Sequence, residues 1–80
     1  MTIQLNLYST TYCHLCEEAE SLLNLLLKQY EFTYTIIEII EDIDLLTLYE
    51  IKIPVLKRLD NQTEICWPFT MNDIKNLLSQ

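Results

Sequence analysis

Glycine is absent from this sequence of 80 residues, although average usage in proteins is about 7%. Tight turns and the C-terminal ends of helices, which often use glycine, must therefore use asparagine, aspartate or a residue in a strained conformation. Basic residues are also few, because five Lys and Arg stand against twelve Asp and Glu, for a net charge of -7. That balance, with no basic run longer than two residues, argues against nucleic-acid binding, whose affinity depends on neutralising phosphates.

Long apolar runs are missing too. The densest run, Leu22 to Leu27, is interrupted by Asn24, whereas a membrane span needs about 18 to 20 apolar residues. The first eight residues alternate apolar and polar positions, which does not fit the apolar core of a secretory signal. Three cysteines, an odd count, then favour the reducing cytoplasm over a disulfide-stapled secreted fold. We expect a soluble cytoplasmic monomer with no membrane contact.

Half of the residues are hydrophobic, which is enough for one compact core but not for two. We therefore expect a single domain over residues 1–80. Apolar positions alternate along residues 2–8, which predicts a strand, and recur every three or four residues along 14–30, which predicts a helix. Similar patterns predict strands near 32–38, 53–56 and 63–67, a helix at 43–50, and a closing helix that begins with a capping box at Thr70 and Asp73.

The predicted order is β-α-β-α-β-β-α, an α/β fold with helices on both faces of a mixed sheet. Asp60 and Asn61 should make the hairpin turn, because both residue types tolerate positive φ. Gln4 and Asn6 fit poorly with a fully covered first strand, so one helical layer should be thin there. The acidic residues between 38 and 44 favour the start of a helix rather than a metal site.

Cys13 and Cys16 follow the first predicted strand and open the long helix. A helix N-terminus offers free amides and the positive end of the dipole, which stabilise a thiolate and lower its pKa. One helical turn brings Cys16 back to Cys13, so the two can form an intramolecular disulfide. We predict that Cys13 is the exposed nucleophile and Cys16 the buried resolving thiol, in a thiol-disulfide oxidoreductase.

The chain resembles the small glutaredoxin-like proteins of the thioredoxin-like superfamily. The resemblance rests on Leu7-Tyr8, on Cys13 to Cys16 with Ala19, on Ile53 to Leu56 and on Trp67 to Phe69. It implies a minimal thioredoxin fold with four strands in the order 2-1-3-4. It also implies a cis bond between Ile53 and Pro54 that faces the cysteines and leaves the backbone of Ile53 free to pair with substrate.

The resemblance further implies reduction of protein or low-molecular-weight disulfides through a mixed disulfide. The partners would be the disulfide substrate and a reductant, either glutathione or a thioredoxin-reductase-like enzyme, with no tightly bound cofactor. The Thr-Val-Pro and Gly-Gly segments by which typical glutaredoxins hold glutathione are absent. The free amides near Thr70 and Met71, with Lys52 as counter-charge, are a substitute site for a carboxylate.

Other residues near the motif have both functional and structural interpretations. His14 would add to thiolate stabilisation if its imidazole were protonated beside Cys13, or would simply face solvent. Tyr12 would cover the nucleophile or contact substrate, or pack the loop. Trp67 would line the rim of the site or pack the end of the sheet, and Cys66 is expected to be a small buried hydrophobe.

Two other classes of function remain open on the sequence. Cys13, Cys16, Cys66 and His14 could bind a metal or an iron-sulfur cluster, although the second half of such a motif is missing, and we expect no metal. Alternatively, the chain is a redox-silent interaction domain with ordinary thiols. Thiol alkylation with mass measurement separates these classes from a dithiol enzyme.

Overall fold

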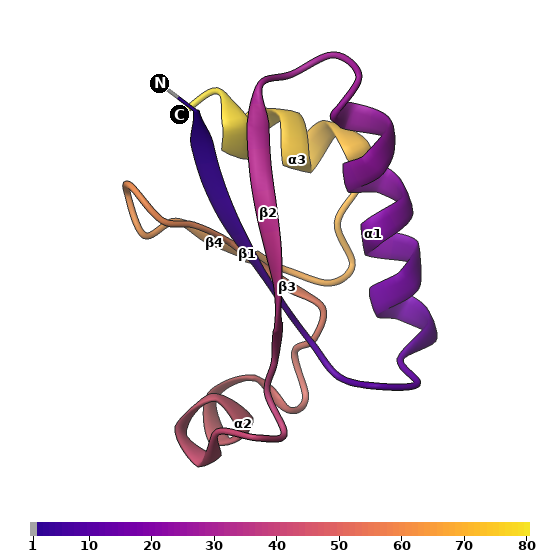
Figure 1. Ribbon diagram of the computed structural model, residues 1–80, viewed down its shortest axis with the longest axis vertical. Helices are drawn as coiled ribbons and strands as arrows, with labels where there is room; N and C mark the ends of the chain where they lie inside the picture. The colour runs from indigo at the N-terminus through magenta and orange to yellow at the C-terminus, as the bar shows by residue number, and fades with distance from the viewer. Residues whose placement is uncertain (1) are drawn as a thin grey trace.

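The computed structural model describes residues 2–80, which form seven elements in the predicted order. None of the helices in this part of the chain is long and apolar enough to cross a membrane. Figure 1 shows the elements, whose bounds are β1 Ile3–Ser9, α1 His14–Leu26, β2 Phe32–Glu38, α2 Ile43–Tyr49, β3 Val55–Arg58, β4 Glu64–Cys66 and α3 Met71–Leu78.

The strands form one mixed sheet in the order β2-β1-β3-β4. β1 runs parallel to β2 and antiparallel to β3, so Leu7 lies opposite Ile36 on one side and Leu56 on the other. β3 and β4 form the expected antiparallel hairpin. This is the minimal thioredoxin fold with strand order 2-1-3-4, which confirms the predicted fold class.

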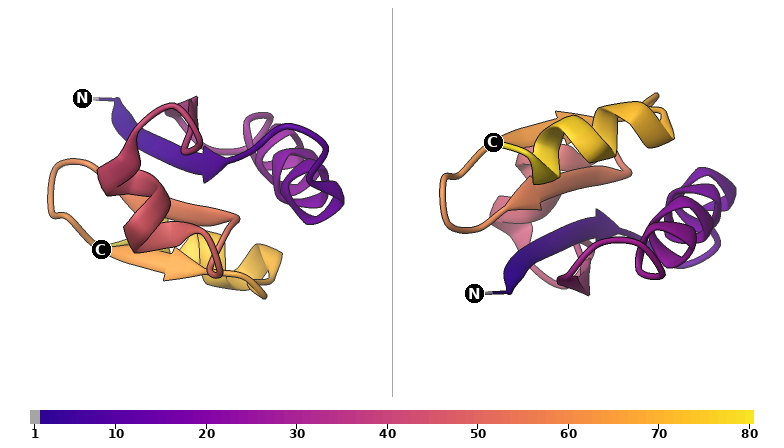
Figure 2. Two further views of the ribbon diagram at one scale, coloured as in Figure 1. Left: turned by 90° about the horizontal axis from the view of Figure 1, so that it is seen from below. Right: turned by 90° about the horizontal axis from the view of Figure 1, so that it is seen from above.

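The main core lies between one face of the sheet and the helices α1 and α3 (Figures 1 and 2). Leu5 and Leu7 point to this face from β1, and both are at most 1% exposed. Leu23 and Leu26 of α1 and Ile74 of α3 meet them and are fully buried. Each such side chain contributes about 1.5 to 3 kcal/mol when it leaves water. The helical and strand periodicities of the sequence therefore converge on one core.

α2 packs on the opposite face but covers only one end of it. Tyr49 of α2 stacks on Tyr8 of β1, with ring centroids 4.5 Å apart, and both pack with Val55. Further along β1 on the same face, Gln4 is exposed and Asn6 is half-buried. The predicted thin helical layer is confirmed, because α2 is too short to reach these two residues.

The bounds of α1 and β3 differ most from the sequence predictions. α1 ends at Leu26 rather than at residue 30, and the next residues form a turn in which the amides of Gln29 and Tyr30 both donate to the Leu26 carbonyl. The apolar periodicity continues beyond the helix and therefore overestimates its length. β3 begins at Val55 rather than Ile53, because the amide of Ile53 still donates to a carbonyl of α2.

Turns without glycine use residues with larger side chains. Tyr12 and Gln62 adopt positive φ, at 62° and 63°. Asp60 and Asn61 lie in the hairpin turn, as predicted, but it is Gln62 that takes the left-handed conformation. The Gln62 side-chain amide donates to the Leu59 carbonyl across the turn at 2.7 Å, which helps to hold this conformation.

Candidate active site

The loop between β1 and α1 delivers Cys13 to the start of the helix. Tyr12 is the residue with positive φ, and its side chain is fully exposed. A left-handed residue reverses the direction of the chain, which allows Cys13 to follow in an extended conformation at φ -100° and ψ 104°. Cys13 is thereby the N-cap of α1, as the sequence predicts.

The sulfur of Cys13 receives a hydrogen bond from the first turn of α1. The backbone amide of Cys16 lies 3.2 Å from Sγ of Cys13 and donates to it. This is the place where a serine or aspartate oxygen caps an ordinary helix. An amide that points at sulfur, at the positive end of the helix dipole, favours a thiolate over a thiol at Cys13.

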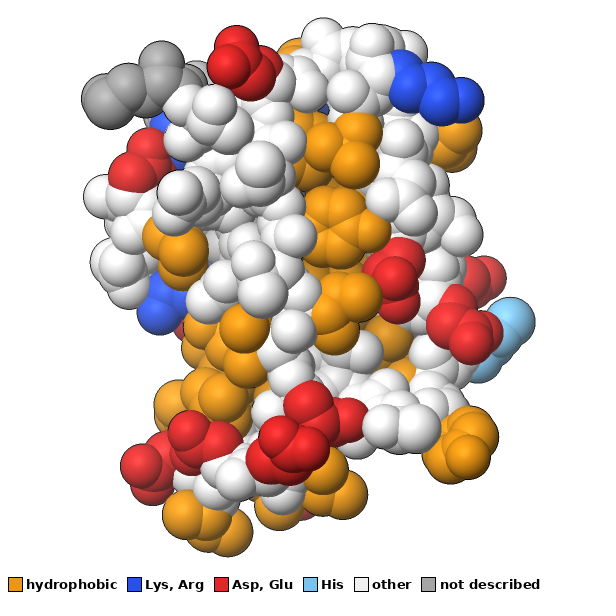
Figure 3. Space-filling model, in the orientation of Figure 1, with side chains coloured by type: hydrophobic (Ala, Val, Ile, Leu, Met, Phe, Trp, Pro, Cys, Tyr) orange, Lys and Arg blue, Asp and Glu red, His pale blue; other side chains and the backbone are white. Residues whose placement is uncertain are grey.

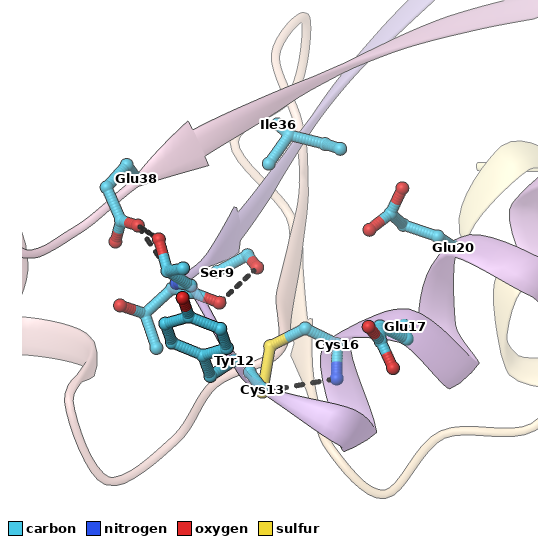
Figure 4. A pocket seen from close by; sticks show the side chains of 10 residues that line it. Ser9, Tyr12, Cys13, Cys16, Glu17, Glu20, Ile36 and Glu38 are labelled. Atoms are coloured by element: carbon cyan, nitrogen blue, oxygen red, sulfur yellow. Dashed lines mark hydrogen bonds between the residues drawn. A yellow bond between two sulfur atoms is a disulfide. The ribbon is translucent and has the colours of Figure 1, made fainter.

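Cys13 and Cys16 are joined by a disulfide (Figure 4), with their Cα atoms 5.2 Å apart. Cys13 is half-buried, whereas Cys16 is only 2% exposed. An incoming disulfide can therefore reach the first sulfur, while the second is accessible mainly from within the pair. This asymmetry matches the predicted division between an attacking and a resolving cysteine.

A pocket of about 250 Å³ opens beside the disulfide (Figure 4). Glu17 and Glu20 of α1 lie on one side of it, and Glu38 at the end of β2 lies on the other. Among the described residues 2–80, these three are the only charged ones that line the pocket, so it is acidic. The other lining residues are Ser9, Thr10, Thr11, Tyr12, Cys13, Cys16 and Ile36.

Glu38 also holds the loop that precedes the nucleophile. One carboxylate oxygen accepts from both the amide and the hydroxyl of Thr11, each at 3.0 Å, and the other accepts from the amide of Ile40 at 3.2 Å. The Ile40 amide, followed by the contacts from Thr10 and Thr11, lowers the pKa of Glu38 below its ordinary value. Glu38 therefore stays ionised beside the disulfide.

The structure places Tyr12 and His14 on either side of Cys13. The Tyr12 side chain lines the pocket and covers no neighbour, since it is 101% exposed. The imidazole of His14 also faces solvent, and its Nδ1 lies 3.6 Å from an oxygen of Glu17. His14 is not among the residues that line the pocket. The structure thus gives the imidazole a carboxylate neighbour, while its effect on the thiolate stays a prediction.

Ile53 and Pro54 lie at the same end of the sheet as the cysteines. Their peptide bond is cis, as predicted, and Val55 pairs with Tyr8, so Pro54 runs past the end of β1 where the cysteine loop begins. The backbone of Ile53 is only partly free, because its amide donates to the Tyr49 carbonyl at 3.1 Å. Within residues 2–80 the Ile53 carbonyl has no hydrogen bond, so it is the group left to accept from a substrate.

Trp67 is connected to this segment through its backbone. Its amide donates to the Pro54 carbonyl at 3.0 Å, and its own bond to Pro68 is also cis, which the sequence did not predict. The indole is half-buried and contacts the ring of Phe69 edge-on. Neither Trp67 nor Pro54 lines the pocket beside the disulfide.

Two sequence expectations fail. The amide of Thr70 is not free for a carboxylate, because it donates to Asp73 while Thr70 caps the amide of Asp73 in return, as the predicted capping box. Cys66 is exposed rather than buried. β4 is an edge strand in which Ile65 faces the core and Cys66 the opposite face. Within residues 2–80, no group of three Cys, His, Asp or Glu could hold a metal.

Sequence reasoning missed Glu20, Glu38 and Ile36 as parts of the site. Glu20 had a detectable signal, because it lies one helical turn beyond Cys16 on the same side of α1. Glu38 and Ile36 had none, since their place depends on the parallel pairing that sets Ser9 opposite Glu38. Their position could be seen only in the assembled sheet.

A protein-family model and several solved structures are similar to this chain. The family model described as glutaredoxin-like domain (DUF836) matches residues 4–79. The solved structure of protein Ne2328 from Nitrosomonas europaea is 29% identical, with a TM-score of 0.85 over 96% of this chain and 92% of that one. Protein XcR50 from X. campestris is also 29% identical, with a TM-score of 0.79 over 94% and 95%.

A more distant likeness supports the fold alone. Thioredoxin 1 from Thermosipho africanus is 15% identical, with a TM-score of 0.66 over 95% of this chain and 94% of that one. Among curated proteins, none matches the sequence.

Proposed function

The chain belongs to the glutaredoxin-like domain family, and from that membership we propose that it is a thiol-disulfide oxidoreductase that works through Cys13 and Cys16. One observation supports this most strongly: the sulfur of Cys13 caps α1 and accepts the Cys16 amide at 3.2 Å. An ordinary cap needs only an oxygen, whereas a sulfur at this place gains the acidity that a nucleophilic thiol requires.

In the proposed reaction, the Cys13 thiolate attacks one sulfur of a substrate disulfide. A Cys13 mixed disulfide forms, and the first substrate thiolate leaves. Cys16 then loses its proton to solvent and attacks the Cys13 sulfur, which releases the second substrate thiolate and closes the Cys13 to Cys16 bond. Two electrons have passed from the dithiol to the substrate, and two thiols of a reductant return them.

The neighbours of the pair would hold the substrate. We assign this role to the exposed ring of Tyr12, to the Ile53 carbonyl and to the cis segment at Pro54, with His14 and Trp67 at the margins of the site. Glutathione or a thioredoxin-reductase-like flavoenzyme would supply electrons without a tightly bound cofactor. We propose that the protein works as a monomer in the cytoplasm, where thiols stay reduced.

Trapping the mixed disulfide tests this proposal. With hydroxyethyl disulfide in excess, the Cys16→Ser, Cys66→Ser double variant should accumulate one mercaptoethanol adduct, on Cys13, because no resolving thiol can release it. Cys13→Ser should turn over no substrate, whereas Cys66→Ser should behave as the unmodified protein. Turnover is measured with glutathione and with a flavoprotein thioredoxin reductase in separate assays. No turnover with either donor, or normal turnover by Cys13→Ser, would refute the proposal.

A further inference from the structure

The charge of the pocket beside the disulfide bears on which substrates can enter it. A disulfide that approaches Cys13 through this pocket comes close to the carboxylates of Glu17, Glu20 and Glu38, and within residues 2–80 no Lys or Arg lines the pocket to offset them. On the face shown in Figure 3, acidic side chains gather at the lower end, where α1 begins and α2 lies. With a net charge of -7, the rest of the molecule adds to this field.

The three carboxylates differ in what else they do. Glu38 is fixed by its hydrogen bonds to Thr11 and Ile40, and Glu17 lies beside His14. Glu20 is half-buried and points from α1 toward the pocket (Figure 4), and within the described residues it accepts no hydrogen bond. Because its carboxylate holds no other part of the fold, it can interact electrostatically with a substrate in the pocket.

The size of the pocket limits what this charge can act on. Sites for drug-sized ligands usually have about 300 to 1,000 Å³, and this pocket has about 250 Å³. It can hold a small disulfide, or the disulfide of a peptide with the groups next to it, but not a drug-sized molecule. Selection should therefore depend on the charge carried within a few bonds of the substrate sulfur.

Building on the proposed function, we infer that Glu17, Glu20 and Glu38 select disulfides flanked by positive charge and disfavour anionic ones. The preferred substrates would be small cationic disulfides or protein disulfides beside Lys or Arg. Oxidised glutathione, which carries net negative charge, would be a poor substrate. Glu20 is the specificity-determining residue that can be changed without disturbing the loop.

Three disulfides of nearly equal size isolate the effect of charge: cystamine carries two positive charges, hydroxyethyl disulfide none, and dithiodipropionate two negative ones. The rate at which each disulfide oxidises the reduced protein is divided by the rate at which the same disulfide oxidises dithiothreitol. This division corrects for differences in the intrinsic reactivity of the three disulfides. At 0.01 M salt we expect cystamine to be preferred over dithiodipropionate by at least about tenfold, and the preference to collapse at 1 M salt, where the screening length is about 3 Å.

Glu20→Gln should lower that ratio about fivefold, as expected for loss of a unit charge roughly 7 Å from the substrate. Because a changed thiolate fraction at Cys13 moves all three rates together, the ratio reports substrate charge alone. Glu31→Gln is the matched control and should leave the ratio unchanged. Glu31 lies at the other end of α1, roughly 20 Å away by helix rise, and its hydrogen bond from Thr2 can be kept by glutamine.

A pair of peptide disulfides, flanked by Lys or by Glu, distinguishes the two sources of positive charge. If the ratio of cationic to anionic rates is larger for the peptides than for the small disulfides, protein disulfides are the preferred substrates. If it is larger for the small disulfides, small cationic disulfides are preferred. Equal normalised rates for all three small disulfides and for both peptides would overturn the inference while leaving the oxidoreductase intact. Failure of neutral hydroxyethyl disulfide to oxidise the Cys13 and Cys16 pair would instead overturn the proposed function.

Discussion

At the scale of single residues, one sulfur replaces the oxygen that normally caps a helix. Cys13 accepts the amide of Cys16 and stands at the positive end of α1, which favours its thiolate. Glu17, in the first turn, opposes this effect by like charge. We therefore expect the acidity of Cys13 to reflect a balance between the backbone dipoles of α1 and the carboxylates of Glu17, Glu20 and Glu38 beside it.

We expect the pKa of reduced Cys13 to lie below the value of about 8.5 for a free cysteine. The measurement is the rate of alkylation against pH in the Cys16→Ser, Cys66→Ser double variant, in which Cys13 is the only thiol. The same chain in urea supplies the reference value. Adding Glu17→Gln should lower the pKa further. If the pKa of Cys13 were the same in the folded protein and in urea, the helix N-terminus would not activate the nucleophile.

Gln62 offers a test of how the chain turns without glycine. A residue other than glycine in the left-handed region costs about 1 to 2 kcal/mol, and Gln62 sits there at φ 63°. Gln62→Gly should be about 1 kcal/mol more stable than Gln62→Ala, because both lose the bond to Leu59 but only glycine relieves the backbone. Urea denaturation of the two variants measures the difference. Equal stabilities would mean that the turn is unstrained.

At the scale of elements, the site is held by connections between segments far apart in sequence. Glu38 ends β2 and ties the cysteine loop at Thr11 to the start of the next loop at Ile40. The pairing of β1 with β3 brings the segment at Pro54 past the same loop. The geometry around Cys13 therefore depends on the sheet as much as on α1.

The stability of the fold should depend on Glu38 in acid. Its pKa in the folded state is lowered, chiefly by the Ile40 amide, so its contribution is present above the unfolded pKa and is lost as pH falls through the folded one. Between about pH 5 and pH 3, Glu38→Gln should lose less stability than the unmodified protein. Exposed Glu18 is the control, and Glu18→Gln should keep the original slope. If stability changed with pH equally in all three proteins, the hydrogen bonds of Glu38 would not stabilise the fold.

The capping box of α3 should contribute measurably to stability. Thr70→Ala removes the oxygen that accepts the Asp73 amide at 3.2 Å and should cost about 1 kcal/mol. Asn72→Ala, in the same turn but outside the box, should leave stability nearly unchanged. The midpoint of urea denaturation gives both values. An equal loss in the two variants would show that the effect belongs to the turn and not to the cap.

Periodicity and capping allowed the elements to be predicted, because they are local properties. Thr70 and Asp73 marked the start of α3, and the alternation of Leu5 and Leu7 marked β1. What could not be predicted depends on partners distant in sequence. Cys66 was predicted to be buried, but the face of the sheet on which it lies is set by the pairing of β4 with β3, which local sequence patterns do not fix.

At the scale of the whole molecule, the cysteine pair and the acidic pocket lie at one end of the sheet. Cys16 is buried in the first turn of α1, while Cys13 is half-buried beside an acidic pocket. The buried guanidinium of Arg58 connects β3 to the carbonyls of Leu77 and Leu78, which closes the fold at the opposite end of β1. The fold thus separates a packed end from a reactive one.

The central claim is that Cys13 and Cys16 form a reversible dithiol. The direct test is to equilibrate the protein with graded ratios of reduced to oxidised dithiothreitol, quench with an alkylating reagent and measure the intact mass. We predict a single two-electron transition in which two thiols disappear together and return on reduction, unchanged in Cys66→Ser and absent in Cys13→Ser. Cys13 and Cys16 thiols that stay alkylatable at every ratio would contradict the account.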